Sequence, residues 1–580
     1  MKRIISLALT LAMMLGVCAM LASCGEPKDD GAEISVYLGE VFDFDPTDYF
    51  VDSNQEQVMS LLFEPLFTVD EKGKLQCDGV AEKYKVDKEE RTIIITLRET
   101  YWSDGVRVTA ADFVHAWRDI ILEPNDANPA AALLYDIENA AEIKRGDVSI
   151  YADFGAEATE IYELTITYRE GADYKQLLKN LASVATSPIR QDIVFNENEG
   201  YWTKFINTAI VNGPFMIADY SVETGSFTLA RNSGYHQDPL TKDYTKIVRP
   251  GALVSFVSTL NSEAVALTYK DIEEKTVFYL ADAPLSDRAE NGEEALRSDD
   301  LSTYSYVFNF DNPLFAIKEV RQALSMAIDR NAIVEAITFG KAASSFLPKD
   351  IYDSKDLITT SSKLDEAKTL LAGVDFSGVS KKFELTVNND EESLKIAELV
   401  VAIWEEELGF DVEINAVGAV LYDDKSTNKE DEKLKFYDSE IQLLVNDAAR
   451  GDRKFDVIAV DWQLYSTDAF VALAAFSTEF SGCGAVLPAN DMKFGSFGGY
   501  RSADYDAYIA AAFAATDEDE RREALYNAEQ LLVEDACIAP IVFNQNFAFV
   551  NKDLSKVEFN GFGNFVLTEV KQKNYEDYLD

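Results

Sequence analysis

The side chains that most often perform catalysis are scarce in this chain or stand at unsuitable spacings. Histidine occurs only twice, as His115 and His236. His115 lies in a predicted helix, where a lone histidine usually has a structural role. The sequence contains no Gly-x-Ser-x-Gly elbow, no His-Glu-x-x-His pair, no phosphate-binding glycine loop and no dinucleotide fingerprint. We therefore expect a protein that is not an enzyme and needs no cofactor or metal, with an extracellular hydrolase as the alternative.

One cysteine near the start of the chain stands in a pattern with its own chemistry. Lys2 and Arg3 precede an apolar run over residues 4–20, and Leu21-Ala22-Ser23-Cys24 follows. A basic start, an apolar stretch and small residues before a cleavage point are typical of a secretory signal. Leu21-Ala22-Ser23-Cys24 resembles a bacterial lipobox, whose cysteine is lipidated and becomes the first residue of the mature protein.

This pattern predicts how the chain meets a membrane. We expect a lipoprotein signal peptide over residues 1–23, lipid attachment at Cys24 and a short tether over residues 24–33. A transmembrane anchor is the alternative, because the apolar run approaches the length that spans a bilayer. The charged, helix-breaking residues 25–31 favour the lipoprotein. A body tethered outside the cell membrane is poorly placed for functions that need ATP, cytosolic cofactors or DNA.

The composition restricts both the architecture and the partners. The chain has 580 residues, 102 of them acidic and 53 basic, with a formal net charge of −49. This length exceeds one hydrophobic core, so we expect roughly two to four domains. The negative surface repels phosphate backbones, so no nucleic acid partner is expected. Beyond the signal and lipid site, Cys77, Cys483 and Cys537 have no metal-binding spacing, and the sequence does not determine whether any two are bridged.

In the first half of the chain, apolar residues recur at strand and helix periods. Residues 91–97 predict a buried strand, and Thr109 opens a helix with Asp112 at the position of a capping box. One apolar face of that helix consists of Phe113, Ala116, Trp117 and Ile120. The acidic stretch over residues 287–300 is predicted to be an exposed connection.

The second half of the chain predicts an α/β arrangement. Alternation over residues 383–387 and 410–414 indicates two strands, separated by a helix with apolar positions from Ile396 to Ile403. The apolar run over residues 457–460 predicts a fully buried strand. Strand, helix, strand and buried strand together indicate a βαβ-containing domain whose sheet is largely covered.

Several sequence blocks follow one another in a familiar order. The string WSDGVRVTAADF over residues 102–113 is the most specific, and it is joined by Asn212-Gly213-Pro214-Phe215, Arg231-Asn232-x-x-Tyr235 and the helix over residues 320–330. These blocks resemble those of the extracytoplasmic solute-binding proteins of peptide-type ABC importers, the oligopeptide/dipeptide-binding family. The resemblance extends from about residue 40 to about residue 565.

The resemblance implies the fold class. It is α/β, a two-lobed clamp like that of periplasmic binding proteins, with an extra domain inserted in the first lobe. Crossovers near Asn309 and Ile541 would form the hinge. The implied bounds are residues 34–69, 186–304 and 541–580 for lobe I, 70–185 for the inserted domain, and 305–540 for lobe II.

The resemblance also suggests a ligand site. Asp456–Trp462 matches the family's FD-x-x-x-x-x-W strand, and Trp462 takes the position of a cleft aromatic, although tryptophan on a buried strand also commonly packs in a core. Relatives often carry an aspartate three residues later, which pairs with the ligand's α-ammonium, but here that residue is Tyr465. Asp461 or Asp468 can replace the charge; otherwise the ligand has no free N-terminus. The candidate ligand-binding residues are Asn54, Asn309, Asp461, Trp462, Tyr465 and Asp468.

The function implied is capture of a solute and its delivery to a transporter. We expect a monomeric lipoprotein at the extracytoplasmic face of the bacterial cell membrane. Its partners would be an ABC permease, the ATPase subunits of that permease, and a peptide or similar small solute. The alternatives are an oligosaccharide or other non-peptide solute, the extracellular hydrolase, and an adhesion or peptide-sensing lipoprotein that no longer serves a transporter.

Overall fold

The computed structural model describes residues 34–573, apart from 40, 42–43, 48–52, 125, 150–152, 197–208, 221–226, 233, 237–253, 258–266, 353, 424–434, 483–497 and 568–569. The predicted signal peptide, tether and lipid site at Cys24 lie outside the described residues. Within them, we find no helix with the length and apolar character needed to cross a membrane. Cys77 and Cys537 are unpaired, and Cys483 is not among the described residues.

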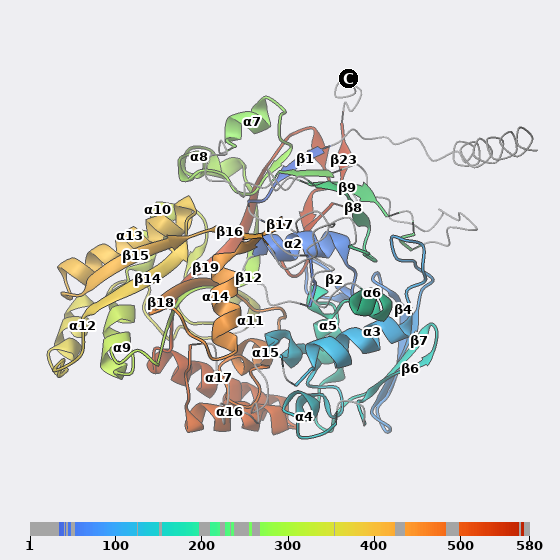
Figure 1. Ribbon diagram of the computed structural model, residues 1–580, viewed down its shortest axis with the longest axis horizontal. Coiled ribbons are helices and arrows are strands. Elements are labelled where there is room, and N and C mark those ends of the chain that lie inside the picture. The colour runs from blue at the N-terminus through green and yellow to red at the C-terminus, as the bar shows by residue number, and fades with distance from the viewer. Residues whose placement is uncertain are drawn as a thin grey trace, which may run out of the picture.

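A large mixed sheet runs through the molecule (Figure 1). Over the described residues its order is β15-β14-β18-β12-β19-β11-β1-β10-β9-β8, with β13 beside β19. These strands are β1 (Ile34–Tyr37), β8 (Phe215–Tyr220), β9 (Phe227–Arg231), β10 (Val254–Val257), β11 (Tyr279–Leu280), β12 (Leu296–Phe308), β13 (Lys341–Ala342), β14 (Lys382–Asn388), β15 (Asp411–Val417), β18 (Val457–Gln463) and β19 (Ile538–Val550).

Two long strands connect the two lobes of this α/β clamp. β12 and β19 have 13 residues each and pair with one another antiparallel. At one end β19 also pairs with β11, and at the other β12 pairs with β18. Their pairing is irregular between Asp299 and Thr303 and again between Tyr304 and Ser305. These irregularities come earlier in β12 than the predicted hinge residue Asn309, whereas Ile541 lies inside β19.

The second lobe contains the predicted βαβ arrangement. β14 pairs parallel with β15 and with β18, and α13 (Glu391–Glu406) connects the first two strands, so the sequence prediction is confirmed. Trp404 of α13 is fully buried, packs on Tyr306 and Phe383, and donates its indole N–H to the carbonyl oxygen of Leu324 (3.0 Å). The remaining helices of residues 305–540 are α9 (Lys318–Ala327), α10 (Arg330–Ile337), α11 (Lys349–Tyr352), α12 (Leu364–Leu371), α14 (Glu440–Ala449), α15 (Ala469–Ala474), α16 (Ala503–Ala514) and α17 (Glu518–Glu534).

A separate four-stranded antiparallel sheet, in the order β4-β5-β7-β6, lies within the range predicted for the inserted domain. Its strands are β4 (Ala81–Asp87), β5 (Thr92–Leu97), β6 (Ala156–Glu160) and β7 (Glu163–Thr167). The predicted capping box is confirmed, because Asp112 accepts hydrogen bonds from both the N–H and the hydroxyl of Thr109 at the start of α3 (Ala110–His115). The neighbouring helices are η1 (Ala116–Ile121), η2 (Pro129–Leu134), α4 (Ala140–Lys144), α5 (Tyr174–Asn180), η3 (Val184–Thr186) and α6 (Gln191–Asn196).

One expectation about the connections is wrong. Residues 287–300 form most of α8 (Leu285–Asn291), then η4 (Gly292–Glu294) and the first part of β12, rather than an exposed connection. The backbone of β12 pairs with β19 here, so its polar side chains do not prevent a strand. Arg288 of α8 is buried, and its guanidinium donates to Glu392 and to the carbonyl oxygen of Ala283.

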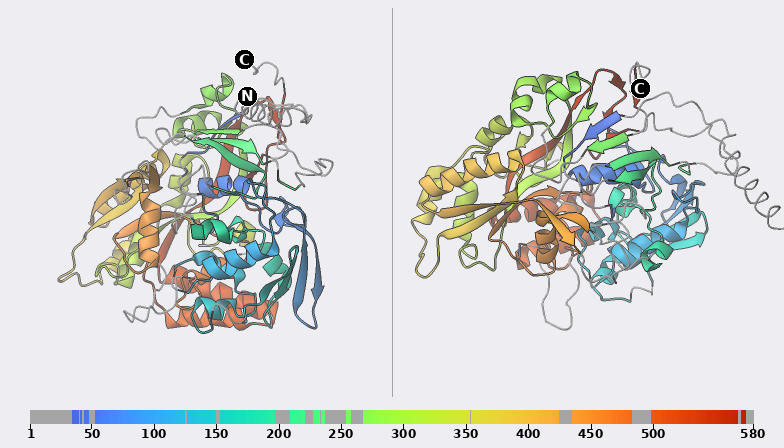
Figure 2. Two further views of the ribbon diagram at one scale, coloured as in Figure 1. Left: turned by 45° about the vertical axis from the view of Figure 1, so that its right-hand side comes forward. Right: turned by 45° about the horizontal axis from the view of Figure 1, so that its top comes forward.

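The remaining elements complete the two ends of the clamp. Figure 1 shows β14, β15, α12 and α13 on one side and α3, α5, β4, β6 and β7 on the other, with α16 and α17 below. Figure 2 gives the same arrangement from two further directions. The helices and strands whose bounds have not yet been given are α2 (Ser53–Leu62), α7 (Tyr269–Glu273), β2 (Thr68–Val69), β3 (Leu75–Gln76), β16 (Ala419–Asp423), β17 (Lys435–Ser439), β20 (Leu554–Ser555), β21 (Glu558–Phe559), β22 (Phe565–Val566) and β23 (Lys571–Gln572).

Candidate ligand-binding site

Trp462 lies near the end of β18 in an aromatic group. Its ring is buried, stacks on Phe476 with centroids 4.7 Å apart, and meets the edge of Phe346 at 6.1 Å. The backbone of β18 pairs with β12 as far as Gln463, so Trp462 is still part of the strand. The described contacts of the ring are therefore with aromatic neighbours in the second lobe.

Asp461 joins two strands of the sheet. Its carboxylate oxygen Oδ1 accepts a hydrogen bond from Asn544 Nδ2 (2.7 Å), and Asn544 Nδ2 also donates to Ser302 Oγ (2.8 Å). Asp461 is opposite Tyr304 in the β12–β18 pairing and is partly buried. Asp461, a polar residue in a largely apolar strand, thus belongs to a hydrogen-bond network that joins β18, β12 and β19.

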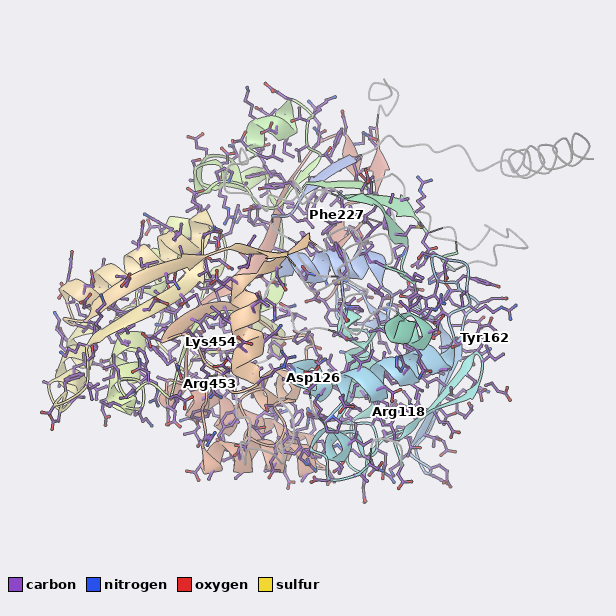
Figure 3. The ribbon with its side chains drawn as sticks, in the orientation of Figure 1. Arg118, Asp126, Tyr162, Phe227, Arg453 and Lys454 are labelled. Atoms are coloured by element: carbon purple, nitrogen blue, oxygen red, sulfur yellow. The ribbon has the colours of Figure 1, made fainter. Side chains whose placement is uncertain are left out.

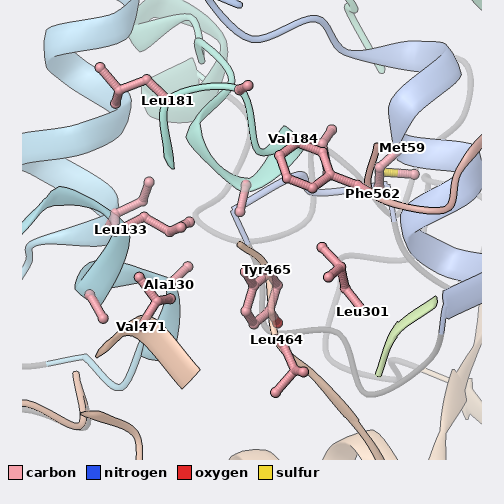
Figure 4. Close-up of a cluster of buried hydrophobic side chains, with 14 of the residues drawn as sticks. Met59, Ala130, Leu133, Leu181, Val184, Leu301, Leu464, Tyr465, Val471 and Phe562 are labelled. Carbon is pink, nitrogen blue, oxygen red and sulfur yellow. The ribbon is translucent and has the colours of Figure 1, made fainter. Parts of the chain in front are cut away.

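Tyr465 occupies the turn after β18 with a left-handed backbone, at a φ of 58°. This conformation is strained for a bulky residue, so its neighbours must hold it in place. The side chain is 4% exposed. Figure 4 shows it in a buried apolar cluster with Leu133 and Ala130 of η2, Leu301 of β12 and Val471 of α15. Apolar side chains therefore surround Tyr465, one of the candidate ligand-binding residues.

Asp468 forms an ion pair with Arg521, which lies in the same range predicted for lobe II. Arg521 Nη2 lies 3.0 Å from both carboxylate oxygens, and the Asp468 side chain is only 3% exposed. Oδ1 also accepts the N–H of Phe470 (3.0 Å), which caps α15. A second pair lies close by, because Arg169 meets Asp136 at 2.7 Å and the charge of Arg521 acts on Asp136. Burial raises the pKa of Asp136, and the two arginines counter that effect.

The other two candidates lie apart from this group. Asn309 follows β12 at the end of β18 opposite to Trp462, where its Nδ2 donates to the carbonyl oxygen of Phe455 (2.8 Å). Asn54 lies in the first turn of α2, but its side chain is outside the described part of the chain. The structure thus brings Asp461, Trp462 and Tyr465 together along one segment, and the ligand role of all six candidates stays a prediction.

A buried acidic residue on α2 was missed by sequence reasoning. Glu56 accepts hydrogen bonds from Gln463 Nε2 of β18 and, at 3.1 Å, from Asn564 Nδ2. Burial raises the pKa of Glu56 to about 7, and the charge of Asp300 adds to the rise while the two amides oppose it. The bond to Gln463 links the predicted first lobe to the second.

Asp300 is the second buried acid of this group. It stands where the β12–β19 pairing is interrupted and accepts the N–H of Leu301 (2.8 Å) and the hydroxyl of Ser302 (2.6 Å). Burial raises its pKa to about 6. The residues after Asp300 mix hydroxyl-bearing and apolar side chains, so the sequence carries little sign that this acid is buried. Glu56 gave none, because helical periodicity does not reveal that a polar residue faces a neighbouring lobe.

The inserted part and the second lobe also meet at the edge of this region. Among the described residues, three hydrogen bonds join them, and Figure 3 labels one of the residues, Asp126, between α3 and α14. The bonds run from Asn128 N to Gly482 O (2.7 Å), from Ser466 Oγ to Asn180 Oδ1 (2.6 Å) and from Arg450 Nη2 to Asp126 Oδ1 (2.9 Å). The bond from Ser466 therefore joins the turn after β18 to the inserted part.

Comparison with known proteins connects this architecture to a family. Residues 78–482 match the bacterial extracellular solute-binding proteins, family 5 (middle). The chain is 25% identical to the oligopeptide-binding protein OppA of Bacillus subtilis strain 168 over 97% of each chain. It is 27% identical to the periplasmic oligopeptide-binding protein OppA of Salmonella typhimurium, over 88% of this chain and 86% of that protein. The crystal structure of Haemophilus influenzae OppA in complex with RPPGFSPFR shares the fold, with a TM-score of 0.74 at 22% identity over 93% of this chain and 99% of that one.

Proposed function

The chain belongs to the bacterial extracellular solute-binding proteins of family 5, and on this premise we propose that it captures a peptide or peptide-like solute and delivers it to an ABC permease. The family consists of binding proteins rather than enzymes. The observation that carries the proposal is the match, over 97% of both chains, to a protein named for oligopeptide binding. The ATPase subunits of the permease would supply the energy, and the protein would act as a monomer.

Capture would occur by closure of the two lobes around the solute. In this proposal residues 34–69, 186–304 and 541–580 move with the inserted domain, 70–185, against residues 305–540. The irregular pairing of β12 with β19 supports a hinge there, because an interrupted ladder bends more easily than a regular one. Small-angle scattering should give a smaller radius of gyration with solute than without, and an identical envelope in both states would exclude closure.

The solute would lie at the end of β18, against Asp461, Trp462 and Tyr465. Peptide binders of this kind can hold the ligand as an added strand, through main-chain hydrogen bonds. A non-peptide solute is the second candidate, favoured by one observation: Tyr465 is enclosed by apolar side chains in place of a carboxylate. Such a solute would need no charged partner at that point.

Native mass spectrometry of the purified protein tests the nature of the solute. Family members that close around a ligand often retain it through purification, so the intact mass should exceed that of the chain, and fragmentation of the released ligand should yield amino-acid residues. The control is the same protein after unfolding, dialysis and refolding, which should lose the extra mass. A released sugar or lipid would refute the peptide and support the second candidate.

The protein would be anchored by lipid at the extracytoplasmic face of the cell membrane. Substitution of Cys24→Ala should release it into the medium or block its processing, because at least two acyl chains are needed for stable anchoring. Metabolic labelling with a radioactive fatty acid and fractionation of cells check both effects. Membrane retention of the variant, without acyl label on the wild type, would contradict the anchor.

A further inference from the structure

Where α2, β12 and β18 meet, two buried carboxyl groups lie near each other. Glu56 of α2 and Asp300 of β12 both lie in this cluster and are nearly inaccessible to water. Their hydrogen-bond partners are neutral amides, a backbone N–H and a hydroxyl. Within the described part of the chain, neither carboxylate forms an ion pair with a lysine, arginine or histidine. The cluster thus brings negative charge into the interior without a positive partner.

Two amide oxygens in the same cluster have no hydrogen-bond partner. Gln463 is 2% exposed, and its Nε2 donates to Glu56 while its Oε1 is unpaired among the described residues. Gln57, also 2% exposed, donates to Asn546 Oδ1 (3.2 Å) and likewise leaves its Oε1 unpaired. A buried acceptor without a donor costs free energy, so a ligand that supplies a donor here would gain by pairing with it.

A primary ammonium group would complete this arrangement. It carries one positive charge and three N–H donors and has no acceptor. The cluster offers two carboxylates and two unpaired amide oxygens, which is the complementary set. A neutral hydroxyl or amide would bring donors but would leave the buried negative charge without a partner.

We propose that Glu56, Asp300 and Gln463 bind an ammonium group of the captured solute. This inference rests on the proposed function and specifies one chemical feature of its ligand. The ammonium group would be either the N-terminus of a peptide or the side chain of a lysine. Binding it from α2 and β18 together would also hold the two lobes closed, since these elements lie in the ranges proposed for different lobes.

The acid–base groups around the cluster support this reading. Glu56 of α2, Asp300 of β12 and Asp468 before α15 all act on Tyr352 of α11, whose hydroxyl donates to the carbonyl oxygen of Ser466. Asp461 reaches the cluster from β18 through Asn544 and Ser302. Among the described residues, the charge that acts on Glu56 itself is that of Asp300. Because burial raises the pKa of Glu56 to about 7, affinity for a cationic solute should increase from pH 6 to pH 8.

A tetrapeptide library tests the proposal on the full chain. Three pools are mixed with the protein: free peptides, peptides acetylated at the N-terminus, and peptides acetylated at both the N-terminus and lysine. Native mass spectrometry then compares the bound fractions. Wild type should prefer an amine-bearing pool tenfold or more, and the first two pools distinguish the N-terminus from lysine. Glu56→Gln and Asp300→Asn should each lose that preference while still binding the fully acetylated pool.

The matched control is Glu529→Gln, which removes another buried carboxyl group with a pKa raised to about 7, bonded to Leu347 N and Ser354 Oγ outside the cluster. It should keep the preference. A second probe, 1,4-diaminobutane, should raise the Tm of wild type above that in sodium chloride of equal ionic strength, and should not do so for Glu56→Gln.

The outcomes separate this inference from the proposed function. Binding of peptides without an amine preference, or an unchanged preference in both variants, overturns the ammonium site and leaves peptide binding intact. If no peptide binds but the diamine stabilises wild type alone, the peptide fails and the ammonium site stands. If neither probe acts, both fail.

Discussion

The substitution Asp468→Asn separates a structural role of this aspartate from a ligand-binding one. The variant keeps an acceptor at Oδ1 for the N–H of Phe470, so the cap of α15 survives. It loses the charge that meets Arg521 through two contacts of 3.0 Å. Stability should therefore fall while the affinity for solute stays nearly unchanged.

The structure sets the size of the effect. Removing one partner of a buried ion pair costs about 3–5 kcal/mol, and a hydrogen bond to a charged group contributes about 1.5–3 kcal/mol. The Arg521 side chain is 25% exposed and also feels the charge of Asp136, so it is not left without a partner. We therefore expect a loss near the lower end, about 2–3 kcal/mol of the free energy of unfolding.

Urea unfolding followed by tryptophan fluorescence measures the loss, and calorimetry with the identified solute measures binding. Asp461→Asn is the matched control, because asparagine keeps the acceptor oxygen that Asn544 Nδ2 meets at this position. Its stability should change by less than about 1 kcal/mol. If Asp468→Asn unfolds like wild type and binds the solute tenfold or more weakly, Asp468 faces the ligand and the structural reading is refuted.

Three further predictions concern the fold. Burial raises the pKa of Glu529 from 4.5 to about 7, so the folded state binds the carboxyl proton more tightly than the unfolded state does. The contribution of this proton to the free energy of unfolding is complete below pH 4.5 and is lost as the pH rises through 7. Relative to Glu529→Gln, wild type should lose roughly 3 kcal/mol between pH 4 and pH 8 in urea titrations, and parallel curves would contradict this. Trp404→Ala should cost about 3–5 kcal/mol by leaving a cavity, whereas a loss below about 1 kcal/mol would mean that the site is not packed as described. Thr109→Ala should cost about 1 kcal/mol by thermal unfolding, and no change would mean that the cap does not form in solution.

Local sequence patterns were sufficient to predict individual elements. The strands at residues 383–387 and 457–460 were predictable because apolar periodicity reports which face of an element is covered. The cap formed by Thr109 and Asp112 was predictable because its hydrogen bonds span only three residues. Contacts between residues close in sequence leave their signature in the sequence itself.

Long-range pairing overrides such signatures. The acidic residues 287–300 read as a connection, yet Leu296–Asp299 pair with residues of β19 that are more than 240 positions away. The free energy of that strand comes from backbone hydrogen bonds, which side-chain polarity does not reveal. The ion pair of Asp468 was likewise not predictable from the sequence, because only the fold brings Arg521 next to it.

The buried carboxyl groups of this protein differ in what surrounds them, and that difference indicates function. Asp468 has an arginine, and Glu529 has a backbone N–H and a serine hydroxyl that satisfy it within one lobe. Glu56 and Asp300 receive only neutral donors and share their cluster with unpaired amide oxygens. Selection for stability alone would replace such acids, because apolar residues of similar volume avoid the desolvation cost. Their presence at this place is explained if a cation arrives with the solute, as the proposed ammonium site requires.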